Sequence, residues 1–123
     1  MNSPRVEFHS VRNYSRFHDV RSSREVIRFR VMERSAFTLL DADWFSTPWE
    51  LAPAASEAVF ARCQGRASEW GGGKSCLIIH THPEAAEEMK RFLTCILNDP
   101  SSWLRWDREC RRFVSLYALE AAA

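Results

Sequence analysis

Apolar and polar side chains alternate along residues 25–32, which is the pattern of a strand with one buried face. One face carries Ile27, Phe29 and Val31, and the other carries Val26, Arg28, Arg30 and Met32. A short turn over residues 33–35 leads to a second strand candidate at residues 36–40, so we expect the two segments to pair as a hairpin. Residues 1–23 give the weakest pattern, although their first stretch also alternates as a strand does.

Helical signals begin near the middle of the chain. Residues 47–50, with a threonine, a proline and a glutamate, have the form of a helix start. A helix is predicted from Pro53 to Gln64, and residues 76–80 are predicted to form a short buried strand. A second helix follows His82, and its predicted core face consists of Met89, Phe92, Leu93 and Ile96.

The last part of the chain has apolar residues at steps of three and four, which is the spacing of one helix face. Asp99 and Pro100 supply a cap and a first-turn proline for this third helix. Its expected stripe consists of Trp103, Trp106, Cys110, Phe113, Val114 and Tyr117. Strands come first and helices mostly later, which indicates an α+β fold. We expect a small, mainly antiparallel sheet covered on one face by about three helices.

Length and composition indicate an ordinary globular protein. The 123 residues fit one domain, so we expect residues 1–123 to form a single compact unit. Hydrophobic residues make up 46% of the chain and charged residues 27%, which argues against general disorder. The apolar run at residues 76–79 is far shorter than the ~20 residues of a membrane helix, and the first residues lack the apolar core of a signal peptide. The sequence therefore predicts a cytoplasmic protein with no membrane contact.

Charge is balanced overall but unevenly distributed. The net charge of +1 is too small for a protein that coats nucleic acid. Residues 1–35 hold eight arginines and four acidic residues, whereas residues 36–60 hold four acidic residues and no basic one. Either the two segments neutralise each other in the fold, or each presents a charged surface to a partner.

Two candidate binding surfaces follow from this distribution. The first is a row of arginines in one register of the predicted strand, formed by Arg24, Arg28, Arg30 and Arg34. An exposed row suits a phosphate backbone or an acidic protein surface; the alternative is a charged face that protects the sheet. The row lacks the interleaved aromatic residues of an RNA-binding sheet. The second surface combines acidic and aromatic residues, namely Asp41, Asp43, Trp44 and Trp49. Tryptophan is frequent at binding hot spots, although these two rings can equally pack into the core.

Motifs for phosphate binding and nucleophilic catalysis are incomplete. The Gly71–Ser75 segment lacks the first glycine of a phosphate loop, because Ser68 stands there, and it precedes a strand where a phosphate loop precedes a helix. Cys76 and His80 would lie about 13 Å apart along a strand, too far for a nucleophile and its base.

The four cysteines lack the short spacings of a zinc or redox site. Cys95 and Cys110 fall on the apolar faces of predicted helices, where a thiol packs as a small hydrophobe. No cofactor is expected from this pattern.

One short segment carries metal-binding residue types. His80-Thr81-His82-Pro83 places two imidazoles two residues apart at a strand end, where both can reach one metal ion. These four residues resemble the core of the JAMM family of zinc-dependent isopeptidases, and the resemblance implies that His80 and His82 are zinc ligands. That family also has a serine and an aspartate in the dozen residues after the proline, and residues 84–93 contain neither. A third ligand is therefore missing locally.

These observations favour a small non-enzymatic protein that binds another macromolecule. The leading hypothesis is a regulator or inhibitor of a protein or nucleoprotein complex, of the kind that phages and other mobile elements carry. The first alternative is a nucleic-acid-binding domain that uses the arginine row. The second is a metal-dependent hydrolase centred on His80 and His82.

Overall fold

The computed structural model describes residues 3–12, 22–63, 67–68 and 75–116. The main sheet has the strand order β1-β2-β3-β6-β5. Its strands are β1 (Arg5–Ser10), β2 (Val26–Glu33), β3 (Thr38–Asp43), β6 (Cys76–Thr81) and β5 (Ala67–Ser68). The β1–β2 pair is parallel, and the other neighbouring pairs are antiparallel. The prediction of a mainly antiparallel sheet in an α+β fold is therefore confirmed.

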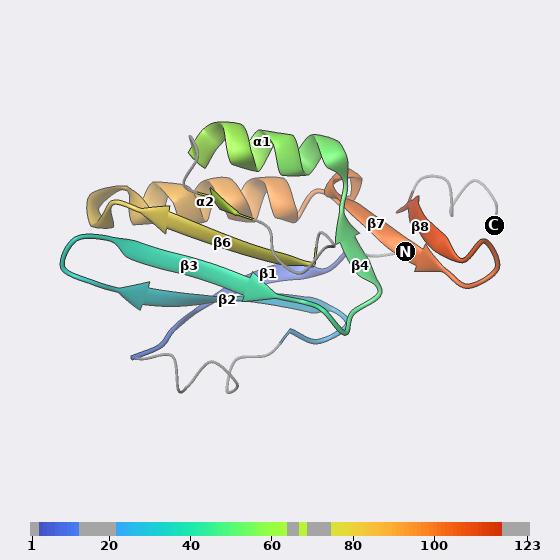
Figure 1. The fold of residues 1–123 in the computed structure, drawn as a ribbon, viewed down its shortest axis with the longest axis horizontal. Coiled ribbons are helices and arrows are strands. Elements are labelled where there is room, and N and C mark those ends of the chain that lie inside the picture. The colour runs from blue at the N-terminus through green and yellow to red at the C-terminus, as the bar shows by residue number, and fades with distance from the viewer. Residues whose placement is uncertain (1–2, 13–21, 64–66, 69–74, 117–123) are drawn as a thin grey trace.

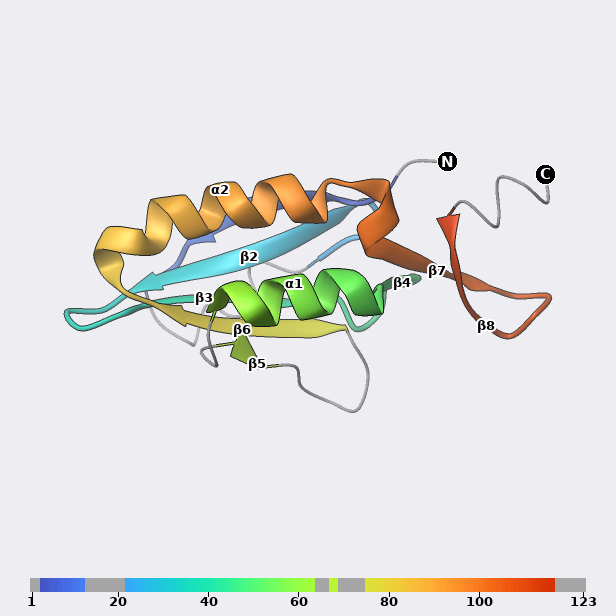
Figure 2. The ribbon, with the colours of Figure 1, turned by 90° about the horizontal axis from the view of Figure 1, so that it is seen from above.

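Two α-helices within the described residues lie side by side over one face of this sheet (Figures 1 and 2). They are α1 (Pro53–Cys63) and α2 (Ala86–Leu97), and a short 3-10 turn, η2 (Pro83–Ala85), precedes α2. The core lies between the helices and the sheet. It includes the predicted apolar face of β2, since Ile27, Phe29 and Val31 are at most 2% exposed.

A smaller sheet stands at one end of the molecule. Its strands are β4 (Trp49–Leu51), β7 (Trp103–Asp107) and β8 (Arg112–Ser115), in the order β4-β7-β8 and antiparallel throughout. Figure 2 shows β7 and β8 extending away from α1 and α2. No helix in the described part of the chain is long and apolar enough to cross a membrane.

The predicted third helix is wrong, because that segment forms the β7–β8 hairpin. Asp99 does act as a cap, since its Oδ1 accepts from the backbone N–H of Ser101 at 3.0 Å, but it caps only the single 3-10 turn η3 (Pro100–Ser102). Aromatic and β-branched residues fit strands well, and β7 pairs with β4, which lies about fifty residues earlier. The hairpin turn ends at Arg111, whose φ of 52° is left-handed and unsuited to a helix. Tyr117, the last member of the predicted stripe, lies outside the described residues.

Other local expectations also need correction. Residues 47–50 do not start a helix, because Trp49–Leu51 is the strand β4 and the Thr47 hydroxyl donates to the Trp44 carbonyl at 2.8 Å. Cys95 and Cys110 are exposed, whereas Cys63 and Cys76 are buried. Cys95 lies on the outer face of α2, and Cys110 lies in the hairpin turn. Residues 71–74 of the glycine segment lie outside the described residues.

Candidate functional site

The predicted arginine row does not form one exposed surface. Arg24 is exposed ahead of β2, and Arg34 is exposed beyond its far end. Arg28 is half-buried, and its Nε lies 3.6 Å from the Glu7 carboxylate of β1. Arg30 is only 5% exposed. The four guanidinium groups therefore cannot bind one ligand as a continuous row, because the two central ones are not exposed.

Arg30 and Asp41 form a buried cross-strand ion pair. The two residues are partners in the β2–β3 register, and the Arg30 Nε donates to Asp41 Oδ1 at 2.7 Å. Both side chains are 6% exposed. Burial raises the pKa of Asp41 and lowers that of Arg30, because removal from water disfavours each charged form, while their mutual hydrogen bond opposes both changes. The pair is an internal part of the sheet, and it is not available for contact with a partner.

The two tryptophans of the acidic-aromatic candidate surface belong to the core. Trp44 is 1% exposed and packs edge-to-face on Trp103, with ring centroids 5.6 Å apart. Trp49 is also buried. Asp43 is exposed, and its Oδ1 accepts from the backbone N–H of Phe45 at 3.0 Å. Of the candidate residues in both surfaces, Arg24, Arg34 and Asp43 remain open to solvent.

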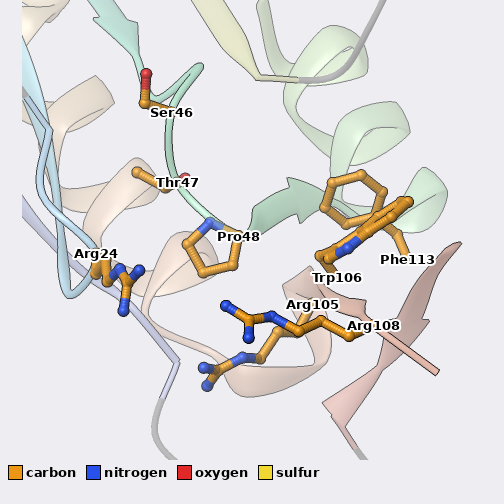
Figure 3. Close-up of a pocket in the computed structure, with 8 residues that line it drawn as sticks. All are labelled: Arg24, Ser46, Thr47, Pro48, Arg105, Trp106, Arg108 and Phe113. Atoms are coloured by element: carbon orange, nitrogen blue, oxygen red, sulfur yellow. The ribbon is translucent and has the colours of Figure 1, made fainter. Parts of the chain in front are cut away.

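The structure brings together a different set of residues where the β3–β4 turn meets the β7–β8 hairpin. A groove of about 440 Å³ opens there. It is lined by Arg24, Ser46, Thr47, Pro48, Arg105, Trp106, Arg108 and Phe113, which we call the arginine groove. In Figure 3 the side chains of Arg105 and Arg108 extend beneath Pro48 toward Arg24, and Trp106 and Phe113 lie at the other end.

Backbone pairing and one buried ring position this groove. The backbone N–H of Trp106 donates to the Pro48 carbonyl at 2.8 Å, which joins β7 to the β3–β4 turn. The Trp49 indole N–H donates to the Arg24 carbonyl, and the Arg105 guanidinium carbon lies 5.3 Å from the centroid of a Trp49 ring. Trp49 thus contacts two of the three groove arginines, although it does not line the groove itself.

The charged side chains among the described lining residues of the groove are all positive. None of the described residues that line it is acidic. Among the described residues, none of the three groove arginines makes an ion pair with a carboxylate. Elsewhere the arginines that contact carboxylates include Arg5, Arg28, Arg30 and Arg62. A concentration of guanidinium groups that pair with no described carboxylate favours an anion at this position.

The sequence patterns singled out one member of this site, Arg24. The helix predicted for this segment has Trp106 in its buried stripe, and Arg105 and Arg108 do not belong to that stripe. In β7 the side chains alternate, so Trp103 turns into the core and Trp106 is 41% exposed. The site was missed because residues 103–107 were predicted to be helical and in fact form a strand.

The histidine segment occupies a separate, smaller site. His80 and His82 are exposed and line a depression of about 200 Å³ together with Ala36, Phe37 and Thr81. The Phe37 and His80 rings meet edge-to-face at 5.3 Å. Across the described ranges, no three histidine, cysteine, aspartate or glutamate side chains are grouped so that they could hold a metal ion. The site therefore offers two imidazoles and an aromatic ring, without a third ligand from the described residues.

Neither a protein-family model, nor a curated protein, nor a solved structure matches this chain. The function is accordingly inferred from the residues of the arginine groove themselves.

Proposed function

We propose that this chain is a small non-enzymatic protein that acts in the cytoplasm by binding another protein, as a regulator or inhibitor. The arginine groove is the proposed contact surface. The observation that carries this proposal is the convergence of three arginines without carboxylate partners, among the described residues, beside an exposed tryptophan. Tryptophan and arginine are among the residue types enriched at the hot spots of protein interfaces.

Exposed apolar surface near the groove supports a protein partner. Trp106 is 41% exposed, and Phe45, in the same turn as Ser46 and Thr47 of the lining, is 68% exposed. Large aromatic side chains that face water gain free energy when a partner covers them. A cationic centre with an aromatic margin is a combination that suits a protein interface.

A nucleic-acid ligand is the second candidate, because arginines beside an aromatic ring also suit a single strand. It differs from the first in measurable ways. Binding to a phosphate backbone falls steeply with salt and is destroyed by nuclease treatment. A protein partner survives nuclease.

The test is an affinity pull-down from source cells with the tagged full chain, with and without nuclease. We compare the wild type with the double variant Arg105→Ala/Arg108→Ala. The expected result is a stoichiometric protein partner that survives nuclease and whose recovery falls about tenfold or more in the groove variant, since hot-spot truncations cost roughly 2 kcal/mol or more.

The matched control is Arg34→Ala/Arg91→Ala, which makes the same change in net charge at two exposed positions outside the groove lining. This control is expected to retain the partner. Equal recovery with the groove variant and the control would contradict the proposed contact surface. A partner that disappears with nuclease would favour the nucleic-acid function.

A further inference from the structure

We infer that the arginine groove recognises an oxyanion on an acidic segment of the partner protein, either a carboxylate or a phosphate group. Arg105 and Arg108 hold the anion, Arg24 flanks it, and an apolar side chain next to it in the partner packs against Trp106. This inference rests on the proposed function and specifies the chemistry of the partner at that same groove.

The charge of the groove points to an anion. Three arginines line one groove, and none of its described lining residues is acidic. Like charges in a recess repel one another, and an anion placed among them removes that cost. The planar guanidinium presents parallel N–H groups that match the two oxygens of a carboxylate or phosphate. Both oxyanions therefore satisfy the same arginines.

One groove arginine has its side chain held in place, and a second is fixed at its backbone. The Arg105 side chain lies over the Trp49 ring at 5.3 Å, and the backbone of Arg24 accepts a hydrogen bond from the Trp49 indole. Trp49 is itself buried, so it acts as a rigid support. Because the Arg105 side chain is held against this ring, it loses less conformational freedom on binding, which lowers the entropic cost of capturing an anion.

The surroundings favour a peptide segment over a nucleic-acid strand. A single strand needs a continuous positive track, but the nearest arginine of β2, Arg28, lies by a Glu7 carboxylate, and the next, Arg30, is buried against Asp41. Positive charge does not continue from the groove along β2. Pro48, Trp106 and Phe113 instead give the groove an apolar side, which suits the mixed acidic and apolar residues of a protein segment.

The experiment measures fluorescence anisotropy of the full chain with four labelled probes of about ten units, at about 50 mM salt, where screening is weak. The first probe is a peptide of aspartates and glutamates around one leucine. In the second peptide, the amide twin, asparagine and glutamine replace those acidic residues, and in the third peptide phosphoserine replaces them. The fourth probe is oligothymidylate. We expect the acidic or the phosphorylated peptide to bind about tenfold or more tightly than the amide twin. Whichever of the two binds more tightly identifies the source of the oxyanion.

The variants assign that binding to the groove. Arg105→Ala/Arg108→Ala is expected to weaken peptide binding about tenfold or more, and Arg34→Ala/Arg91→Ala to change it less than about twofold. Equal binding of the amide twin, tighter binding of oligothymidylate than of either peptide, or unchanged affinity in the groove variant would each overturn the inference. If the groove variant loses the cellular protein partner while neither charged peptide binds, the proposed function stands and only the inferred chemistry fails.

Discussion

Replacement of Asp41 by alanine is expected to reduce the free energy of unfolding by about 3–5 kcal/mol, because it removes one member of a buried ion pair and leaves the other charge in the protein interior. Both side chains are 6% exposed, so water cannot replace the lost carboxylate without opening the sheet. The measurement is urea unfolding at neutral pH, followed by circular dichroism, for the wild type and the variant.

Two further variants make this result specific. Arg30→Met/Asp41→Leu removes both charges and is expected to recover most of the lost stability, since well-packed apolar residues often replace a buried pair at little cost. Asp43→Ala changes an exposed carboxylate two residues along the same strand and is expected to cost about 1 kcal/mol or less. A loss below about 1 kcal/mol for Asp41→Ala would show that the pair is hydrated.

The same double variant separates the predicted arginine row from the arginine groove. Arg30 lies inside the sheet, whereas Arg105 and Arg108 line the groove. Arg30→Met/Asp41→Leu should therefore leave partner binding unchanged, even though Arg30 belongs to the row that the sequence suggested.

Local periodicity in the sequence was sufficient to identify β2 and α2 and the faces that they bury. The alternation at residues 25–32 identified β2 and its buried face, because a half-buried strand imposes period two on its own residues. The spacing of Met89, Phe92, Leu93 and Ile96 identified α2, in which Leu93 is fully buried and the other three pack partly against the core.

Periodicity does not show what covers the second face of a strand. The even positions of β2 suggested an exposed basic row, but Val26, Arg30 and Met32 are buried. The carboxylate that neutralises Arg30 belongs to β3, eleven residues later in the chain. The surplus of acidic residues at 36–60 was visible in the sequence, yet which acid faces which arginine depends on the strand register.

The arginine groove was missed for a related reason. It forms only because β4 pairs with β7 across more than fifty residues of sequence, with Trp49 opposite Arg105 and Leu51 opposite Trp103. In the sequence, steps of three and four among aromatic residues suggested a helix, because short aromatic-rich segments satisfy both patterns. The pairing of β4 with β7 decided in favour of the strand, and it also determined that Trp106 and not Trp103 faces water.

Trp103 and Trp106 therefore provide a direct test of this hairpin and of the site. Trp103→Ala is expected to lower the free energy of unfolding by about 3–5 kcal/mol, since its ring is fully buried and its indole N–H donates to the Leu97 carbonyl at 2.6 Å. Trp106→Ala is expected to cost about 1 kcal/mol or less, mainly from its edge-to-face contact with Phe113 at 5.3 Å. Urea unfolding of both variants measures the difference.

Partner binding, unlike stability, is expected to depend on Trp106 and not on Trp103. Trp106→Ala should weaken recovery of the protein partner by about tenfold or more, as loss of an interface hot spot does. Trp103→Phe keeps a ring in the core while it removes the indole N–H, so it should lose about 1–2 kcal/mol of stability and retain the partner under native conditions. A helix would place both tryptophans on one buried stripe, and both alanine variants would then be equally destabilised. Equal destabilisation would thus contradict the β7–β8 hairpin, whereas a stable Trp106→Ala variant with full binding would contradict the groove as the contact surface.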